Sequence, residues 1–594
     1  MAYCNPLRFS LSVAWVFLVS ISASVVAAHE HPYGSPWEYS DLSAESILDR
    51  SIRALGGQGV LESVKTISSH AFIYRSFSLA ESNTPGVADT GISTAGEQTI
   101  SYDLSDPSIV VQRIDRKDVL GDYWTFQRTL LEMPESSLVV RSGLDGYACF
   151  TAGNMFLFAP SIVPFGYTDR KRPPSLLQNR KILKDLLLAF YADVLVRDAW
   201  RFSPAIVRKL QSANGTLSTS AIEINDGRFH PAITDSSINL TVIFDPETYL
   251  PARVRAYENH PIFGPSTNDV VMYNYTTANV ISLPQNVKLL YNEDLMLQEI
   301  LFDTFEINPS LSPDFFEGLP IAISNQTFSG APPVPAQHSE IFSPAEIFES
   351  SQNFIYAGPY SGTLPALKVI KPIPSLPNLY HLTFEDNTVY RTILAIFDDA
   401  VMVTDAPPHQ SKLVIHYVQE TFNRSVTHLL VTHHHHDHNL GAADYVAIGA
   451  KLVVPEQFTY YWKDIPNVQF ETASEGLPFT HKDSGMQVHG IWHLVDAHSA
   501  DWMYFTFTTA CPSSDSELGI VTADAWSPGV DPFGYGQRPV LQWLAIARMD
   551  GVPKDHMELP IHGEPLPADG LYTEIGYEYP DYTISDFLSG SCLC

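Results

Sequence analysis

Positive charge is in short supply in this chain. Its 594 residues include 35 Lys and Arg against 66 Asp and Glu, which gives a formal net charge of −31 at pH 7. A surface this acidic repels phosphate backbones and anionic lipid. The composition therefore argues against nucleic acid as a substrate or partner.

Long hydrophobic runs are absent beyond residue 28, so we expect no later segment to cross a bilayer. Residues 1–28 resemble a secretory signal peptide, with Arg8 first, an apolar core over Leu11–Val26 and a small-residue cleavage site at Val26-Ala27-Ala28. An uncleaved anchor is the alternative, because Phe9–Ala28 is just long enough to span a membrane. The small-residue end favours cleavage. We therefore predict a secreted, extracellular protein with no stable membrane span after cleavage.

Cysteine is scarce as well. Removal of the signal peptide takes Cys4 away and leaves four cysteines: Cys149, Cys511, Cys592 and Cys594. In an exported protein these can form disulfides, and the sequence does not distinguish the three complete pairings. A eukaryotic secretory route would also make glycosylation sites of five Asn-x-Ser/Thr sequons, at Asn214, Asn239, Asn274, Asn325 and Asn423.

A histidine-rich run carries the strongest chemical signal. Residues 431–438 have the spacing H-x-H-x-D-H, formed by His433, His435, Asp437 and His438. Imidazole and carboxylate are ligands suited to zinc. Alternate residues of an extended backbone share a side, so the first two histidines can hold one metal ion. The turn that follows can bring the aspartate and the last histidine to a second ion, while the intervening His434 and His436 point away. The alternative is a solvated His-rich tract with adventitious metal affinity.

Three later segments each add one candidate ligand: His498 in Val495–Asp501, Asp524 in Gly519–Ala525 and His562 in Leu559–Gly563. In order and spacing, the four segments together resemble the metal-binding segments of the metallo-β-lactamase superfamily. The resemblance implies that His498 completes a first zinc site, Asp524 bridges two zinc ions and His562 closes the second site. Ala497, Asp501 and Ala523 stand where the family has glycine, so the loop shapes are expected to differ there.

The resemblance also implies a reaction. Two zinc ions would lower the pKa of a bridging water, and Asp437 would orient the resulting hydroxide for attack on a polarised carbonyl. An aspartate rather than a cysteine at position 524 departs from the antibiotic-hydrolysing members and agrees with the thioesterase, lactonase and phosphodiesterase branches. We therefore predict a secreted binuclear zinc hydrolase that cleaves an ester, lactone or thioester bond of a small molecule with a metal-bridging hydroxide. The sequence leaves the oligomeric state open.

Two other functions compete with this prediction. An iron-dependent oxidoreductase would use the same scaffold, as persulfide dioxygenases and flavodiiron proteins do, but all second-site ligands are present and no segment resembles flavodoxin. An apolar-ligand carrier with an inactive hydrolase domain is the third hypothesis. The intact ligand set argues against it, because an inactive site usually loses residues.

The length exceeds what one hydrophobic core fills, and 45% hydrophobic against 17% charged residues describes a globular chain. We predict a β-rich α+β domain over 29–326, a linker over 327–340 and a catalytic domain over 341–594. The N-terminal elements expected from periodicity are helices at Ser43–Leu55 and Ile182–Leu195, a hairpin of Leu240–Phe244 with Ala252–Tyr257, and strands at Ala71–Tyr74, Asp269–Tyr275 and Asn286–Tyr291. With Ala54-Leu55-Gly56-Gly57 and Asp245–Pro251, this half resembles the curved sheet of LolA-like lipoprotein carriers.

For the C-terminal domain the resemblance implies an α/β fold, the αββα sandwich of the metallo-hydrolases. The strands expected here are Asn378–Glu385, Thr388–Ile396, Ala400–Thr404, Val426–Val431 and Lys451–Val454, and the helices are Leu413–Thr421 and Asn439–Ile448. Asp405 follows one of these strands and resembles a family aspartate that lies near the metals. A strand-end turn cap is the alternative role for Asp405.

Overall fold

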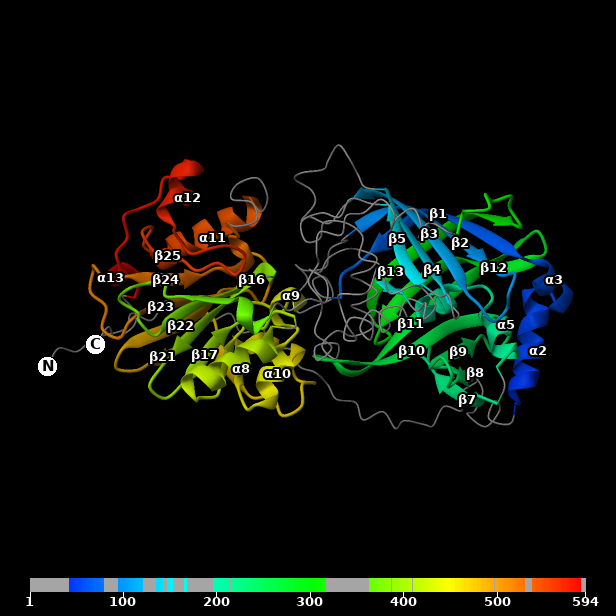
Figure 1. Ribbon diagram of the computed structural model, residues 1–594, viewed down its shortest axis with the longest axis horizontal. Helices are drawn as coiled ribbons and strands as arrows, with labels where there is room; N and C mark the ends of the chain where they lie inside the picture. The colour runs from blue at the N-terminus through cyan, green and yellow to red at the C-terminus, as the bar shows by residue number, and fades with distance from the viewer. Residues whose placement is uncertain are drawn as a thin grey trace, which may run out of the picture.

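The chain is β-rich, with large sheets and few helices (Figure 1). The computed structural model describes residues 42–79, 94–120, 135–142, 147–152, 165–167, 196–213, 215–316, 363–385, 387–408, 410–495, 497–528 and 537–588. Several predictions lie outside these residues: the signal peptide, the helix at 182–195, the linker at 327–340 and both predicted domain boundaries. Within the described residues, no helix is both long and apolar enough to cross a membrane.

The N-terminal half is built on one antiparallel sheet in the order β6-β5-β4-β3-β2-β1-β13-β12-β11-β10-β9-β8-β7. Its strands are β1 (Thr66–Ser76), β2 (Thr94–Asp103), β3 (Val111–Leu120), β4 (Glu135–Arg141), β5 (Tyr147–Ala152), β6 (Phe165–Tyr167), β7 (Leu217–Glu223), β8 (Phe229–Asp235), β9 (Leu240–Phe244), β10 (Pro251–His260), β11 (Gly264–Ala278), β12 (Ile281–Tyr291) and β13 (Leu295–Ile307). Helices α2 (Ala44–Leu55), α3 (Gln58–Ser63) and α5 (Ile206–Gln211) pack beside it.

The two clearest N-terminal predictions are confirmed. Helix α2 begins after Ser43, whose side chain accepts a hydrogen bond from a backbone N–H in the first turn, and it ends at Gly56 with φ +125°. A Cβ at Gly56 would collide with the carbonyl oxygen of Val280, so the position requires glycine. The β9–β10 hairpin forms as predicted, because Asp245 accepts hydrogen bonds within its turn, including one of 2.7 Å from the N–H of Thr248.

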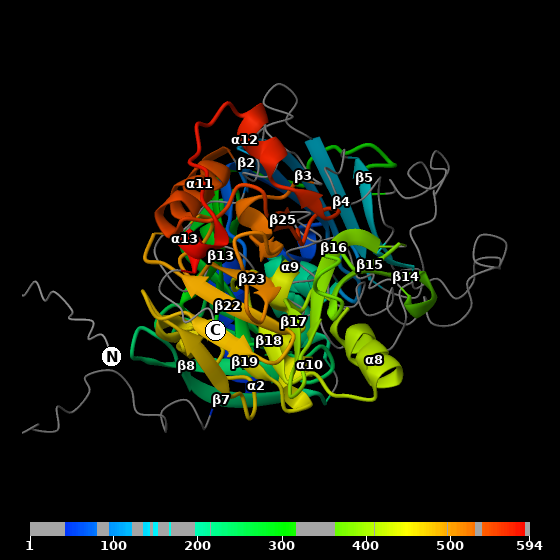
Figure 2. The ribbon, with the colours of Figure 1, turned by 90° about the vertical axis from the view of Figure 1, so that its left-hand side faces the viewer.

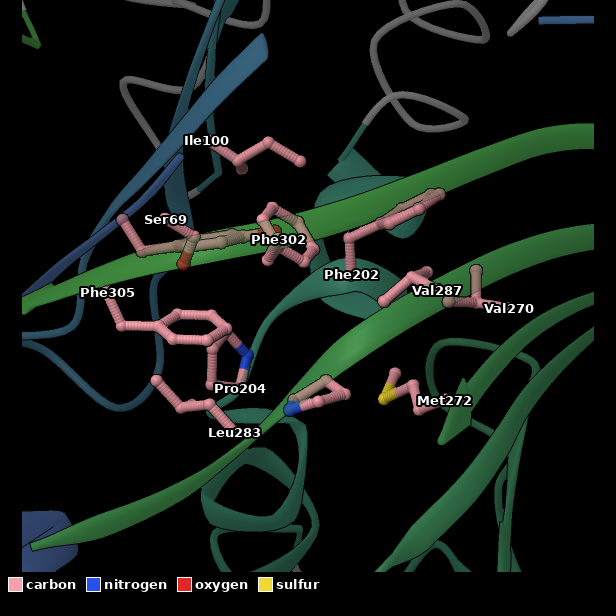
Figure 3. Close-up of a pocket in the computed structure, with 12 residues that line it drawn as sticks. Ser69, Ile100, Phe202, Pro204, Val270, Met272, Leu283, Val287, Phe302 and Phe305 are labelled. Carbon is pink, nitrogen blue, oxygen red and sulfur yellow. The ribbon is translucent and has the colours of Figure 1, made fainter. Parts of the chain in front are cut away.

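One face of the large sheet carries an apolar hollow of about 390 Å³, open solvent included (Figure 3). Side chains from several strands and from the segment before α5 line it, among them Ile100, Phe202, Val270, Met272, Val287 and Phe302. The hollow lies entirely on residues of the N-terminal half.

The C-terminal half has two smaller sheets. The first has the order β14-β15-β16-β17-β18-β19-β20, and it is antiparallel up to β17 and parallel from there on. Its strands are β14 (Leu367–Ile370), β15 (Leu379–Phe384), β16 (Asn387–Ile396), β17 (Val401–Thr404), β18 (His428–Leu430), β19 (Lys451–Pro455) and β20 (Phe470–Ala473). The second runs in chain order through β21 (Phe479–Lys482), β22 (Met486–Trp492), β23 (Met503–Thr509), β24 (Leu518–Val521), β25 (Met557–Glu558) and β26 (Leu566–Pro567).

Successive side chains along these strands point to opposite faces of each sheet, so the apolar residues form separate core layers on the two faces. One cluster joins the two sheets and includes Met402 and Leu430 from the first and Val488 and Phe505 from the second. On the outer face of the first sheet, apolar residues pack with helices α8 (Ser411–Phe422) and α10 (Ala442–Ala447). On the outer face of the second sheet they pack with α11 (Gln537–Asp550), α12 (Asp569–Glu574) and α13 (Ile584–Phe587). Figure 2 shows α8 and α10 on one side of the sheets and α11 on the other.

The C-terminal strand predictions are confirmed to within a few residues, but the helix predicted at Asn439–Ile448 is wrong in its bounds. Helix α9 (His436–Asn439) begins earlier, and the chain breaks at Gly441 before α10. The N–H of Gly441 donates to the carbonyl of Ala406 at 3.0 Å. The Gly441 N–H is therefore bonded outside a helix, and a Cβ at this position would lie 2.7 Å from Oγ of Ser411, so the close approach requires glycine.

Candidate metal centre

Every predicted ligand follows the end of a strand in the C-terminal half. The H-x-H-x-D-H run follows β18 and continues into α9, and His498 lies in the loop between β22 and β23. Asp524 lies in the short 3-10 helix η6 (Ala523–Ala525) after β24, and His562 follows β25. The fold thus brings together, at the ends of strands in the two sheets, candidate ligand residues that are up to 129 positions apart in the sequence.

The structure brings all seven predicted ligands together, in two groups that share one carboxylate. The first group is His433, His435, His498 and Asp524; the second is Asp437, His438, Asp524 and His562. Within each group the candidate ligand atoms all lie within 4.8 Å of one another. A shared aspartate between two such groups is the arrangement expected of a carboxylate that bridges two ions.

The first group consists mainly of imidazoles. Nε2 of His498 lies 3.1 Å from Nδ1 of His435 and 3.6 Å from Oδ2 of Asp524. The ring of His433 lies 4.4 Å from that of His435 and 4.8 Å from that of His498, measured between centroids. Three ring nitrogens and one carboxylate oxygen therefore surround a single point.

The second group contains two carboxylates. Nε2 of His438 lies 3.1 Å from Oδ1 of Asp524, 3.2 Å from Nε2 of His562 and 3.7 Å from Oδ2 of Asp437. Nε2 of His562 is also 3.2 Å from Oδ1 of Asp524. Two carboxylates and two imidazoles thus surround a second point.

These separations fit metal ligands. Zinc bonds to nitrogen and oxygen of about 2.0–2.2 Å place the corners of a tetrahedron roughly 3.4 Å apart. The separations given above, from 3.1 to 3.7 Å, lie around that value. Buried atoms that would face the ions have no hydrogen-bond partner among the described residues: Nε2 of His433, Oδ1 of Asp437 and both oxygens of Asp524. Buried polar atoms without partners are costly, and a cation would satisfy all four.

The charge states of the three first-group histidines and of Asp524 also suit metal binding. Burial, reinforced by neighbouring imidazoles, lowers the pKa of His433 and His435 well below the usual histidine range, and burial lowers the pKa of His498 to about 4. These rings are therefore neutral at pH 7, as metal ligands must be. Burial alone would raise the pKa of Asp524, but His438 and His562 hold it well below its ordinary value. The shared carboxylate is therefore ionised.

Asp405 orients the second group. It is fully buried and accepts hydrogen bonds from the backbone N–H and the hydroxyl of Thr432, both at 2.8 Å, and from the side-chain amide of Asn439 at 3.1 Å. Nδ1 of His438 donates to it at 2.9 Å, which fixes the tautomer and leaves Nε2 for an ion. The structure thus gives Asp405 both of the roles considered from sequence: it caps the strand end with φ +55° and contacts a ligand.

The two intervening histidines lie outside both groups, as predicted, but sequence reasoning missed their roles. Nδ1 of His434 donates to Oδ1 of Asp501 at 2.7 Å, and both side chains are buried. Asp501 also accepts from Oγ of Ser499 at 3.0 Å. This pair joins the histidine-rich run to the loop that carries His498. The sequence offered one sign of this contact, which is that position 501 holds an aspartate where the metallo-β-lactamase pattern has glycine. Nε2 of His436 lies 2.8 Å from the hydroxyl of Tyr461.

Four further histidines near these segments of the sequence lie outside both groups: His481, His489, His493 and His556. Three of them contact carboxylates elsewhere: His481 with Asp399, His493 with Asp550 and His556 with Glu558. Ala523, where the family has glycine, has φ +48°, a left-handed conformation that glycine adopts easily. The departure from the family pattern therefore keeps the backbone shape that glycine would allow.

No protein-family model matches the chain, and no curated protein matches it. Among solved structures, those similar to this chain include metallo-β-lactamases. The enzyme from Pontibacter korlensis is 13% identical, with 35% of this chain and 97% of that chain covered and a TM-score of 0.27. A B3 metallo-β-lactamase with an active-site glutamic acid is 16% identical, with 33% and 81% covered and a TM-score of 0.26. A subclass B3 enzyme from a soil metagenome library is 12% identical, with 34% and 83% covered and a TM-score of 0.25. Since these scores lie far below 0.5, we base the function on the site's own geometry.

Proposed function

We propose that the C-terminal half is an αββα metallo-hydrolase that holds two zinc ions and cleaves an ester-like bond of a small molecule. The observation that carries this proposal is the pair of four-ligand groups joined by Asp524, with four ligand atoms buried and unpartnered. His433, His435 and His498 would hold one ion, and Asp437, His438 and His562 the other. The two outer helical layers and the shared core between the sheets support the αββα arrangement.

When bound, the two ions would lower the pKa of a water between them toward neutrality and polarise the substrate carbonyl. The chain's own part is to orient that water and to receive its proton. Asp437 offers one carboxylate oxygen to the second ion, so its other oxygen would be left to accept a hydrogen bond from the attacking water. Burial raises the pKa of Asp437, with a further contribution from Asp524, which makes this carboxylate a better proton acceptor.

The metal-ligand atoms indicate which kind of substrate bond is cleaved. Both groups contain only nitrogen and oxygen ligands, and position 524 holds an aspartate in place of the cysteine of antibiotic-hydrolysing enzymes. Asp524 thus favours an ester, a lactone or a thioester over a β-lactam. The strong net negative charge disfavours polyanionic substrates such as nucleic acid.

Metal content tests the proposal. The mature protein should hold close to two zinc ions per chain by elemental mass spectrometry, and Asp524→Ala should lose metal while Asp515→Ala, an exposed aspartate, should not. Hydrolysis of a panel of esters, lactones and thioesters should disappear in His435→Ala. Iron in place of zinc would favour the oxidoreductase alternative. Failure to bind metal after reconstitution would rule out the hydrolase.

A second candidate function rests on a separate observation, the apolar hollow in the large sheet (Figure 3). Its apolar lining suits an apolar ligand, which is the function expected from the resemblance to LolA-like carriers. Binding of an apolar fluorescent probe that is lost in Met272→Asp and unchanged in His435→Ala would support carriage. Probe binding together with full metal-dependent hydrolysis would show two functions in one chain.

Export is part of the proposal. The described sequon residues Asn239, Asn274 and Asn423 are all exposed, which glycosylation requires. The disulfide-bonded state of Cys511 supports an oxidising compartment. N-terminal sequencing and glycosidase treatment of the protein recovered from medium test this; an intact Met1 in a membrane fraction would favour the anchor alternative.

A further inference from the structure

The histidine-rich run that carries four of the seven candidate ligands ends in a single helical turn. Helix α9 has four residues, far fewer than a helix needs for stability on its own. It contains Asp437 and His438, and His435 is its N-cap. Side chains from elsewhere must therefore hold this turn in place.

Two of these supports come from the C-terminal half itself. Asp405 binds the end of the turn through His438 and Asn439, and Asp501 binds the residue before it through His434. His436 lies between a ligand of the first group and a ligand of the second. Its side chain is fully buried, and its surroundings therefore decide where the middle of the turn lies.

The N-terminal sheet supplies those surroundings. The ring of His260, the last residue of β10, lies 5.1 Å from the ring of His436, and Phe263 lies 5.9 Å from it, between centroids. Phe263 also meets the ring of Tyr461 edge-on at 5.4 Å, and the Tyr461 hydroxyl lies 2.8 Å from Nε2 of His436. Figure 1 shows β10 and β11 reaching toward α9 from the large sheet.

The β10–β11 turn is itself firmly built. Nδ1 of His260 accepts hydrogen bonds from the N–H groups of Ile262 at 3.1 Å and Phe263 at 3.2 Å. The rings of His260 and Phe263 stack with centroids 4.5 Å apart and an angle of 22°. Ile262 is fully buried in a hydrophobic cluster that also contains Tyr461 and runs through both halves of the molecule. A turn fixed in this way can hold its neighbour still.

We propose that the β10–β11 turn, through His260 and Phe263, positions the metal-binding turn by holding His436. This inference rests on the proposed function, because it assigns the N-terminal sheet a part in building the metal centre. His260, Phe263 and His436 are positioning residues; none lies in either ligand group. Removing the contact would let the middle of α9 move, and His435 and Asp437 would move with it.

Cobalt binding tests the proposal, because the visible spectrum of Co²⁺ reports ligand geometry directly. The full chain, stripped of metal, is titrated with Co²⁺ as wild type, Phe263→Ala, His260→Ala and Phe263→Tyr. Tyr257→Ala is the matched control. It also removes an aromatic ring from β10, but the Tyr257 side chain is 42% exposed. Far-ultraviolet circular dichroism and melting temperature follow the fold of each variant.

We expect Phe263→Ala and His260→Ala to weaken Co²⁺ binding roughly 10–100-fold and to alter the spectrum, as loss of residues that orient ligands does. Phe263→Tyr, which keeps the ring, and Tyr257→Ala should bind like wild type. If an alanine variant fails to fold, Phe263→Leu takes its place, and the same loss is expected because the leucine has no ring to stack. Unchanged affinity and spectrum in folded variants, with wild type binding two ions, would overturn this inference alone. A wild-type chain that binds no cobalt would overturn the proposed function, and the inference with it.

Discussion

The two ligand groups differ in chemistry and in how they are held. The first contains three imidazoles whose pKa values are lowered mainly by burial, and the His434–Asp501 pair connects two of its loops. The second contains two carboxylates, and Asp405 fixes its central histidine. Burial disfavours a charged His438, yet Asp524 and Asp437 raise its pKa well above the usual range. The three imidazoles of the first group thus stay neutral, whereas the second group balances opposite charges.

The two groups therefore depend on different residues outside the ligand set. Asp501 supports the first group and Asp405 the second, and only Asp524 belongs to both. Substitutions outside the ligand set should therefore affect one ion more than the other.

Asp405→Asn should have the largest effect. The amide cannot accept all four hydrogen bonds that the carboxylate accepts, and the tautomer of His438 is no longer fixed. We expect affinity for the second ion to fall roughly 10–100-fold, with the first ion affected less. Zinc titration by calorimetry measures both steps. Equal weakening of both ions would show that the groups do not have separate supports.

The stability of the metal-free protein should depend on pH through the first group. Burial lowers the pKa of His498 to about 4, below the roughly 6.5 of an exposed histidine. The unfolded chain therefore binds more protons between these values, and stability is fully present above pH 6.5 and is lost as the pH falls toward 4. For His498 alone the loss amounts to about 3 kcal/mol.

Denaturant unfolding of metal-free protein at several pH values measures this loss. His498→Asn should reduce the pH dependence in that window, and Tyr257→Ala should leave it unchanged. A slope that persists fully in His498→Asn would assign the effect to other groups.

That the seven candidate ligands lie together could be predicted from sequence, because each lies in a short motif whose spacing is local. The β9–β10 hairpin and α2 could be predicted for the same reason, since Asp245 and Gly56 determine the turn and the helix end locally. Boundaries were less accurate where tertiary contacts decide them. The break at Gly441 depends on Ala406 and Ser411, about 30 residues earlier in the chain.

The supports of the site could not be predicted. The contact of His260 with His436 joins the end of strand β10 to helix α9, and no local pattern encodes it. The periodicity of the strands indicates that one face of the sheet is buried. It does not predict that the sheet has thirteen strands, or which end of the sheet lies beside the metal centre. Long-range packing decides both.

Asp501→Asn should have a smaller effect than Asp405→Asn, because the amide keeps the size of the side chain and can still accept a hydrogen bond from Nδ1 of His434. Loss of the charge on a buried partner should lower affinity for the first ion by about tenfold. Competition with a zinc chelator at pH 7 measures it. Selective loss of the second ion instead would contradict the assignment of Asp501 to the first group.

Ser499→Ala should have the smallest effect. Its hydroxyl donates a single hydrogen bond of 3.0 Å to Asp501, which keeps its stronger contact with His434. A neutral donor of this kind contributes about 1 kcal/mol to the free energy of unfolding, and little of that should reach the metal. We expect a small decrease in melting temperature and first-ion affinity within about threefold of wild type. A larger loss of the first ion, at unchanged stability, would mean that Ser499 rather than His434 fixes the position of Asp501 and hence of the loop carrying His498.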